Sequence, residues 1–502
     1  MVLIEASDHT GGAVYSAEVT APGFVSDMFS AFYPLAAASP VIQGLELEAH
    51  GLSWSRSPDV LAHTLDDGRV AVLRTDPADT ATGLEEFASG DGDAWLQMVA
   101  QWDRLRAPLL DALFTPFPPM IPLARLLRHT GTAGAFDLAR LAVTPVRRLG
   151  LERFRGIGGP LLLTGNAMHS DVPPDAAGSG VFGWLLAMLG QDVGFPVPRH
   201  GAGQLATALE RRAVGKGVHV ITGAAVTRIR VRSGRANAVE LQDGSVVRGT
   251  RAILADVSAP SLYGDLLDPV HVPSRFRDGL RRFQWDNSTI KVNWALSGPV
   301  PWTAEGARGA GTVHLGVDLD GFVDFAADLS VGRTPARPFV LVGQMTTADP
   351  TRSPTGTESV WAYTHVPRAT QWSAAAIDAH VRRVEAAIER VAPGFAARVI
   401  ASHVQSPSDL EGDDVNLSGG AINGGTSGLH QQLFMRPTIG LGRAETPIPG
   451  LFLASAAAHP GGGVHGACGW NAARAALLDH GPRGAVHRAL IRSAWGRLLR
   501  DN

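Results

Sequence analysis

The segment PGLFLASAAAHPGGGVHGACGWNAARAAL, residues 449–477, combines an apolar run, a glycine-rich stretch and a helical pattern. Residues 451–454 predict a buried strand, residues 455–465 a loop, and residues from about 464 to 478 a helix. Gly461, Gly462 and Gly463 let the loop backbone approach a ligand closely, because glycine lacks a Cβ. A glycine-rich turn before a helix offers free N–H groups to an anion, so we predict an anion-binding turn here.

Two histidines, His459 and His465, flank the three glycines. One interpretation is that they line a cofactor pocket and act as a base. The other is that they only hydrogen bond to carbonyls of the loop. A metal site would need a third ligand, which the sequence does not offer, so no metal is predicted.

The first residues, MVLIEASDHTGGAV (1–14), have the pattern of the middle of a dinucleotide-binding unit. In such a unit a G-x-G-x-x-G turn follows the first strand, and an acid about 20 residues later binds a ribose hydroxyl. Residues 2–5 predict a buried parallel strand that ends in Glu5, and Gly11 and Gly12 follow where a loop passes a pyrophosphate. The alternative is that Glu5 only caps an edge strand. No glycine fingerprint precedes Glu5, so we expect a truncated N-terminus, or else a protein that has lost catalysis.

The rest of the chain divides into segments rich in predicted helix and segments rich in predicted strand. Around residues 92–150 and 181–189 the apolar spacing predicts helices, interrupted by prolines at 116, 118, 119 and 122. Strands dominate from about 288 to 370, and amphipathic helices are predicted at 374–391 and 483–499. Between them, residues 203–214 predict a helix that is followed by strands near 218–222, 226–232, 236–241, 246–248 and 252–255.

Composition limits the classes of function. With 502 residues the chain is long enough for two or more domains. Its 44 basic and 47 acidic residues give a net charge of −3, which gives no electrostatic basis for binding nucleic acid. The single cysteine excludes an internal disulfide. We find neither an apolar run long enough for a transmembrane helix nor a signal peptide, and expect a cytoplasmic protein.

Three stretches together, VLIEASDHTGGAVYSAEVTAPGFVSDMFSAFYP, GAGQLATALERRAVGKGVHVITGAAVTRIRV and PGLFLASAAAHPGGGVHGACGWNAA, resemble the phytoene dehydrogenase-like FAD oxidoreductases (the carotenoid/retinoid oxidoreductase group). NGGTSGLHQQLFMRP (423–437) is typical of their pyridine nucleotide-disulphide oxidoreductase domain-containing branch. The likeness covers nearly the whole chain. One departure is Ala13, where the family usually has Arg.

The resemblance implies an α/β fold: a Rossmann-like FAD-binding domain of the glutathione-reductase/amine-oxidase type, N-terminally truncated, with an inserted α+β substrate domain. The FAD domain would comprise residues 1–60, 196–275 and 436–482, the substrate domain 61–195 and 276–435, and a C-terminal amphipathic helix 483–502. The implied FAD-binding residues are Glu5 (adenosine ribose), Gly11 and Gly12 (pyrophosphate), Val226 (adenine), Ser455 and Ala456 (pyrophosphate and ribityl chain), and Gly461, Gly462, Gly463 and Val464 (isoalloxazine).

The implied activity is hydride transfer from a small lipophilic substrate to flavin N5, with a quinone, oxygen or another acceptor taking the electrons. Two alternatives stay open: a non-catalytic binding protein with a vestigial flavin fold, and a redox-neutral flavin-dependent isomerase. The basic helix at 483–499 is consistent either with peripheral membrane contact or with packing on its own domain. The sequence does not indicate the oligomeric state.

Overall fold

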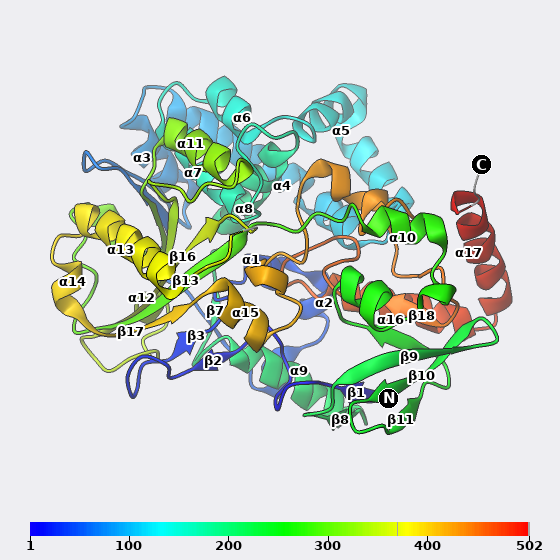
Figure 1. Cartoon of the computed structure of the whole chain (residues 1–502). Helices are drawn as coiled ribbons and strands as arrows, with labels where there is room; N and C mark the ends of the chain where they lie inside the picture. Colours follow the sequence, from blue (N-terminus) through cyan, green and yellow to red (C-terminus); the bar gives the residue numbers. More distant parts are fainter. Residues whose placement is uncertain (369, 500–502) are drawn as a thin grey trace.

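A seven-stranded mixed sheet forms the centre of the larger part of the molecule (Figure 1). The structure is a computed structural model that describes residues 1–368 and 370–499. The strand order is β17-β13-β16-β15-β14-β5-β6, and only β5 and β14 pair in parallel. The strands are β5 (Asp59–Thr64), β6 (Val70–Leu73), β13 (Ser288–Leu296), β14 (Ala310–Leu315), β15 (Val340–Gln344), β16 (Glu358–Val366) and β17 (Val399–Gln405).

The two faces of this sheet differ in character. Alternate residues of a strand point to opposite faces, and on β13 the side chains of Val292 and Trp294 join an apolar cluster with Val384 and Ile388 of α13 (Ala374–Val391). The alternate residues of β13, Lys291 and Asn293, face the other way. This second face is partly polar, although every residue of β13 is buried.

Helices cover one end of the sheet. Helices α7 (Gly158–Met168) and α8 (Ser179–Val193) pack on β5 and β6. Four more lie around them in the upper part of Figure 1: α3 (Pro77–Glu85), α4 (Asp91–Phe114), α5 (Met120–Leu141) and α6 (Val146–Arg153). Helix α11 (Leu319–Ser330) contacts α7.

The smaller region contains two parallel strand pairs. Strand β1 (Val2–Ile4) pairs with β8 (His219–Ile221), and β12 (Ile253–Ala255) pairs with β18 (Leu451–Leu453). The other elements of this region are the antiparallel strands β9 (Val226–Arg232), β10 (Arg235–Leu241) and β11 (Val246–Arg248) and the helices α9 (Gly203–Gly215), α16 (Ala467–His480) and α17 (Gly484–Leu498).

Short strands and helices occur in both regions and between them. They are β2 (Ser16–Ala17), β3 (Ser26–Asp27), β4 (Trp54–Ser55), β7 (Val197–Pro198), α1 (Pro34–Ala38), α2 (Pro40–Gln43), α10 (Ser274–Leu280), α12 (Met345–Ala348), α14 (Phe395–Arg398) and α15 (Pro407–Asp413). The domain boundaries expected from the sequence stay a prediction, and residues 500–502 of the expected C-terminal segment lie outside the described residues.

Most expected elements are confirmed, and three expectations need correction. The strand at 2–5 is parallel but not buried: Val2 is 44% exposed, because in the described residues β1 pairs only with β8. The helix expected from about 464 begins at Ala467, after Gly466 with its positive φ of 71°. Pro122 does not break a helix but lies in the first turn of α5, where a backbone N–H has no helical partner to lose.

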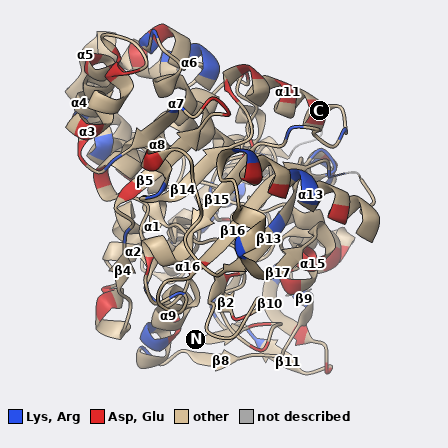
Figure 2. Cartoon of the chain, turned by 90° about the vertical axis from the view of Figure 1, so that its left-hand side faces the viewer, with Lys and Arg blue, Asp and Glu red and all other residues tan. Residues whose placement is uncertain are grey.

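On the face shown in Figure 2, acidic and basic residues are interspersed over the helices and strands rather than gathered by sign. No helix among the described residues combines the length and apolar character needed to cross a membrane.

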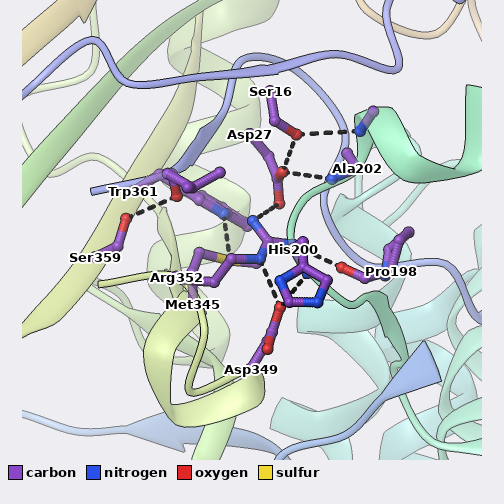
Figure 3. A network of polar contacts seen from close by, with 12 residues as sticks. Ser16, Asp27, Pro198, His200, Ala202, Met345, Asp349, Arg352, Ser359 and Trp361 are labelled. Atoms are coloured by element: carbon purple, nitrogen blue, oxygen red, sulfur yellow. Dashed lines mark hydrogen bonds and ion pairs between the residues drawn. The ribbon is translucent and has the colours of Figure 1, made fainter. Parts of the chain in front are cut away.

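A buried ion network joins the two regions (Figure 3). Arg352 is fully buried, and its guanidinium lies 2.9 Å (Nη1) from Asp27 Oδ2 and 3.0 Å (Nε) from Asp349 Oδ2. Its Nη2 donates to the carbonyl of Pro198 at 3.1 Å. Asp27 belongs to β3 and Asp349 follows α12, so one side chain connects the N-terminal segment with the large sheet.

Asp27 has further partners that place it firmly. Its Oδ1 accepts hydrogen bonds from Ser16 Oγ at 2.7 Å and from the N–H of Ala202 at 2.8 Å, just before α9. Its backbone carbonyl accepts a hydrogen bond from Lys291 Nζ at 2.6 Å. The network therefore fixes β3 against both α9 and β13.

We expect Arg352→Met to lower the free energy of unfolding by about 3–5 kcal/mol, because it leaves two buried carboxylates without their cation. Arg69→Met, which removes a surface pair with Asp67, should cost much less stability, because solvent screens an exposed ion pair. Urea unfolding of both variants measures the difference, and equal losses would contradict the structural role of Arg352.

Candidate functional site

The loop between β18 and α16 requires its glycines. Gly461 and Gly463 have φ values of +111° and +119°, which side-chain-bearing residues rarely adopt. A Cβ at Gly462 would lie 2.4 Å from the carbonyl oxygen of Asn423, and one at Gly463 would lie 2.9 Å from Leu35 Cδ1. The three glycines were expected to let a ligand approach the loop backbone. In the structure, two of them also pack against the segments that contain Asn423 and Leu35.

The same loop presents a row of free donors. Within the described residues, the N–H groups of Gly461, Gly462, Gly463 and Val464 make no hydrogen bond. They precede the N-terminus of α16, whose helix dipole adds positive potential. Unpaired N–H groups near a helix N-terminus suit an anionic or carbonyl-rich ligand, so the donor set fits the edge of a flavin ring.

Both histidines of the loop are buried and hydrogen bonded. His459 Nε2 lies 3.2 Å from the carbonyl oxygen of Thr115. His465 Nδ1 accepts the N–H of Ala467 at 3.0 Å, so its Nε2 carries the proton and donates to the carbonyl of Gly461 at 3.3 Å. These are the carbonyl contacts of the second interpretation, and the catalytic role stays a prediction.

Burial also sets the charge of these rings. Desolvation lowers the pKa of each histidine to about 4, so both are neutral near pH 7. The thiol of Cys468 lies beneath the loop, within 3.9 Å of the carbonyl oxygens of Ala458, His459 and Gly461, and burial raises its pKa to about 12. Neither histidine nor the cysteine is ionised at neutral pH. Among the described residues, no group of three or more His, Cys, Asp and Glu side chains is placed to hold a metal ion.

At the other end of the region, Glu5 directly follows β1. Its Oε1 accepts the N–H of Ser7 at 2.8 Å, and its backbone bonds to Ile221 and Ala224 beside β8. Gly11 and Gly12 have positive φ values of +114° and +50°. A Cβ at Gly11 would lie 2.6 Å from Ala206 Cβ, so α9 packs directly on this turn.

Two acids that the sequence did not single out lie near Glu5. A Cβ at Gly12 would lie 3.0 Å from Asp414 Oδ2. Partial enclosure by protein, with the carboxylates of Asp414 and Glu5 nearby, raises the pKa of Asp256 to about 6. The charge of Asp256 also contributes to the raised pKa of the Cys468 thiol beneath the glycine loop. Asp256 therefore lies between the early and late stretches, which the structure brings together.

The remaining predicted FAD-binding residues, Val226, Ser455 and Ala456, lie in or shortly after strands, and two of them form hydrogen bonds to neighbouring segments. Val226 begins β9 and is half-buried. Ser455 Oγ donates to the carbonyl of Val257 at 2.6 Å and so ties the end of β18 to the end of β12. The carbonyl of Ala456 accepts a hydrogen bond from Arg436 Nε at 2.9 Å.

Sequence reasoning missed Lys291. Its ammonium is buried among Asp27, Asn293 and the ring of Trp361, with Nζ 2.6 Å from Asn293 Oδ1 and no carboxylate in ion-pair contact among the described residues. Desolvation lowers the pKa of Lys291 to about 7. A lone lysine within the apolar strand STIKVNWAL was the available signal, because lysine is rarely buried without a function or a partner.

Comparisons with known proteins identify the family of the chain. The family model described as flavin containing amine oxidoreductase matches residues 1–477. Pyridine nucleotide-disulfide oxidoreductase domain-containing protein 2 of Mus musculus is 28% identical over 515 residues, which cover 93% of this chain and 87% of that protein. The zeta-carotene-forming phytoene desaturase of Myxococcus xanthus is 26% identical over 309 residues, which cover 60% of this chain and 56% of the desaturase.

The fold also matches a solved structure. An oxidoreductase from Methanosarcina mazei has a TM-score of 0.62 at 13% identity, and the match covers 94% of this chain and 93% of that one. The expected resemblance to phytoene dehydrogenase-like enzymes and the expected α/β fold are thus confirmed.

The neutral loop histidines should make the protein sensitive to acid. Below pH 6.5 the unfolded chain binds protons on both, whereas the folded chain does not until about pH 4. Stability therefore falls as the pH drops through this window. We expect the free energy of unfolding to fall between pH 7 and pH 5 by up to about 2 kcal/mol for each histidine.

Urea unfolding at pH 7 and pH 5 tests this expectation. His459→Gln and His465→Gln should each show a smaller difference between the two pH values than the parent protein. The exposed His129→Gln should leave the difference unchanged. If the two loop variants retain the full difference, the buried neutral state of these rings is wrong.

Proposed function

This chain belongs to the flavin-containing amine oxidoreductase family, and on that premise we propose that it oxidises a lipophilic substrate by hydride transfer to FAD. The observation that carries the proposal is the row of free N–H groups from Gly461 to Val464 before α16. Membership of the family makes the protein an FAD-dependent oxidoreductase, which removes the expected alternative of a non-catalytic protein. The redox-neutral isomerase is left as an outcome of the test below.

The residues present suit FAD in a defined orientation. Glu5 would bind the adenosine ribose, because a carboxylate accepts the hydrogen bonds that hydroxyl groups donate. The turn with Gly11 and Gly12 would lie along the pyrophosphate, and Val226 would contact adenine through its backbone. Ser455 and Ala456 would line the ribityl chain, and the glycine triplet with Val464 would face the ring. Bound FAD supplies hydride acceptance at N5.

The protein itself must take up a proton when a C–C bond is desaturated. We assign this role to Lys291, which reaches neutrality near pH 7 and lies on the polar face of β13 against the N-terminal segment. Groups with strongly shifted pKa values concentrate at functional sites. His459 and His465 are the other proposed bases, but burial lowers the pKa of each to about 4, so each is a weaker base than Lys291.

A lipophilic substrate is proposed from the relatives, one of which is named a phytoene desaturase. The test is anaerobic mixing of the flavin-loaded protein with phytoene in detergent, and with putrescine as a polar amine. We expect the hydrocarbon to bleach the visible flavin band and the amine to leave it unchanged. Conversion of phytoene without bleaching or any acceptor would support the isomerase, and bleaching by the amine alone would contradict the lipophilic substrate. Re-oxidation by a quinone or by oxygen then identifies the electron acceptor.

We expect Lys291→Met to lower the rate of flavin reduction by about 10²–10⁴-fold, the usual contribution of a positioned base. In the parent protein kcat/KM should rise with pH up to about 7 and then level off, because only the unprotonated amine accepts a proton. Lys216→Met, on the surface beside α9, is the matched control. A pH profile of Lys291→Met that keeps the same rise would contradict the assignment.

Peripheral membrane contact through α17 is proposed as the route by which a lipophilic substrate arrives. Ile491, Trp495 and Leu498 pack on the domain, but Val486 and Leu490 are each 65% exposed. Beside them, a shallow cavity of about 540 Å³ is lined by Leu477, Leu478 and two arginines between α16 and α17. Exposed apolar side chains next to arginines suit an anionic lipid surface.

Binding to vesicles of phosphatidylserine and phosphatidylcholine tests the membrane contact. We expect the double variant Val486→Glu with Leu490→Glu to co-sediment at least about tenfold less, since it loses apolar contact and adds negative charge. Val331→Glu, at an exposed apolar site after α11, should sediment as the parent does. Equal binding by all three proteins would exclude α17 as the contact.

A further inference from the structure

Arg436 is a buried cation that the proposed chemistry does not yet use. Its side chain is only 2% exposed, and among the described residues it forms no ion pair with a carboxylate. Its three nitrogens donate instead to backbone carbonyls: Nε to Ala456 at 2.9 Å, Nη1 to Thr426 at 3.0 Å and Nη2 to Gly424 at 3.1 Å. Although burial lowers its pKa to about 10, Arg436 remains charged at neutral pH.

This guanidinium lies directly against the glycine loop. A Cβ at Gly461 would come within 3.4 Å of Arg436 Cζ, so no side chain separates the cation from the first glycine of the triplet. The hydrogen bond to Ala456 holds the other end of the same loop. Arg436 thus contacts the loop on both sides of His459.

The segment that Arg436 binds is held from the opposite side by Asp286. The carboxylate of Asp286 accepts the N–H groups of Ile422, Asn423 and Gly425 at 2.8–3.1 Å. Residues 422–426 therefore lie between an anion that binds their N–H groups and a cation that binds their carbonyls. Asp286 makes no ion pair with Arg436, although its charge acts on the guanidinium and favours the protonated form.

A buried charge without a contacting counter-ion is costly, so the arrangement indicates an anion that is present during the reaction. Resting on the function proposed above, we propose that Arg436 is a positioning residue that fixes the glycine loop and whose charge favours the reduced, anionic form of bound FAD. A hydride carries one proton and two electrons into the ring, so the ring gains one negative charge while the substrate loses one. A fixed cation behind the loop stabilises that product and not the neutral oxidised ring.

The test is the two-electron midpoint potential of bound FAD, measured by dye-coupled reduction of the holoenzyme. We expect Arg436→Met to shift the equilibrium at least tenfold toward the oxidised form, a decrease of about 30 mV. Arg436→Lys should retain most of the parent potential, because it keeps the charge. Arg474→Met, an exposed arginine on α16, is the control and should not change the potential, since solvent screens its charge.

A second variant changes the local charge and leaves Arg436 in place. Gln432 Oε1 lies beside the same glycine, 3.6 Å from the Cβ position of Gly461. The isosteric Gln432→Glu would supply Arg436 with a counter-ion and should also lower the potential by about 30 mV, a tenfold shift.

The outcomes separate this inference from the proposed function. Holoenzyme variants Arg436→Met or Gln432→Glu with the parent potential would overturn the role of Arg436 alone. A parent protein that binds no FAD would contradict the proposed function and this inference together. If Arg436→Met does not fold, Gln432→Glu decides.

Discussion

The contact on which the two regions depend is the one between Arg352 and the carboxylates of Asp27 and Asp349. A fully buried guanidinium is stable only while both partners stay in place, so separation of the regions would leave three charges without compensation. The same Asp27 binds Ser16 and the start of α9 through its carboxylate and Lys291 through its carbonyl. The position of the lysine amine in the large sheet is therefore set by an ion pair that belongs to the junction and not to the sheet alone.

Two other buried cations, Lys291 and Arg436, have no carboxylate in contact within the described part of the chain. Their chemistry separates their roles. A lysine can lose its proton when it is desolvated, and burial brings the pKa of Lys291 to about 7. The arginine stays charged under the same penalty, with a pKa of about 10. Desolvation thus turns the first residue into a proton acceptor and leaves the second as a permanent source of positive potential. The difference matches the roles proposed for the lysine on the buried polar face of β13 and for the arginine behind the glycine loop.

Features that depend on residues close together in the chain could be predicted from the sequence, whereas contacts between distant residues could not. Apolar periodicity gave α9, α13 and β9 nearly residue for residue, since such patterns depend on neighbours in the chain. The glycine loop was found because three consecutive glycines have few structural explanations. The Arg352–Asp27 ion pair and the proximity of the Asp256 and Glu5 carboxylates involve residues far apart in sequence. Nothing local in the sequence marks these residues as neighbours. The hydrogen bonds of His459 and His465 depend on ring orientation, which no sequence pattern contains.

The proposed FAD site has negatively charged groups near Glu5 and positively polarised groups near Gly461 to Val464. Around Glu5 the accessible groups are carboxylates, Asp256 and Asp414, which only accept hydrogen bonds and suit the hydroxyl groups of a ribose or ribityl chain. Around Gly461 to Val464 the accessible groups are N–H donors, backed by a helix dipole and by Arg436, which suit carbonyl oxygens and negative charge. A ligand placed in reverse would set hydroxyl donors against N–H donors and a reduced ring against carboxylates. For the FAD orientation that we propose, this distribution of charge would direct the acceptor ring to the end where the protein can stabilise added electrons.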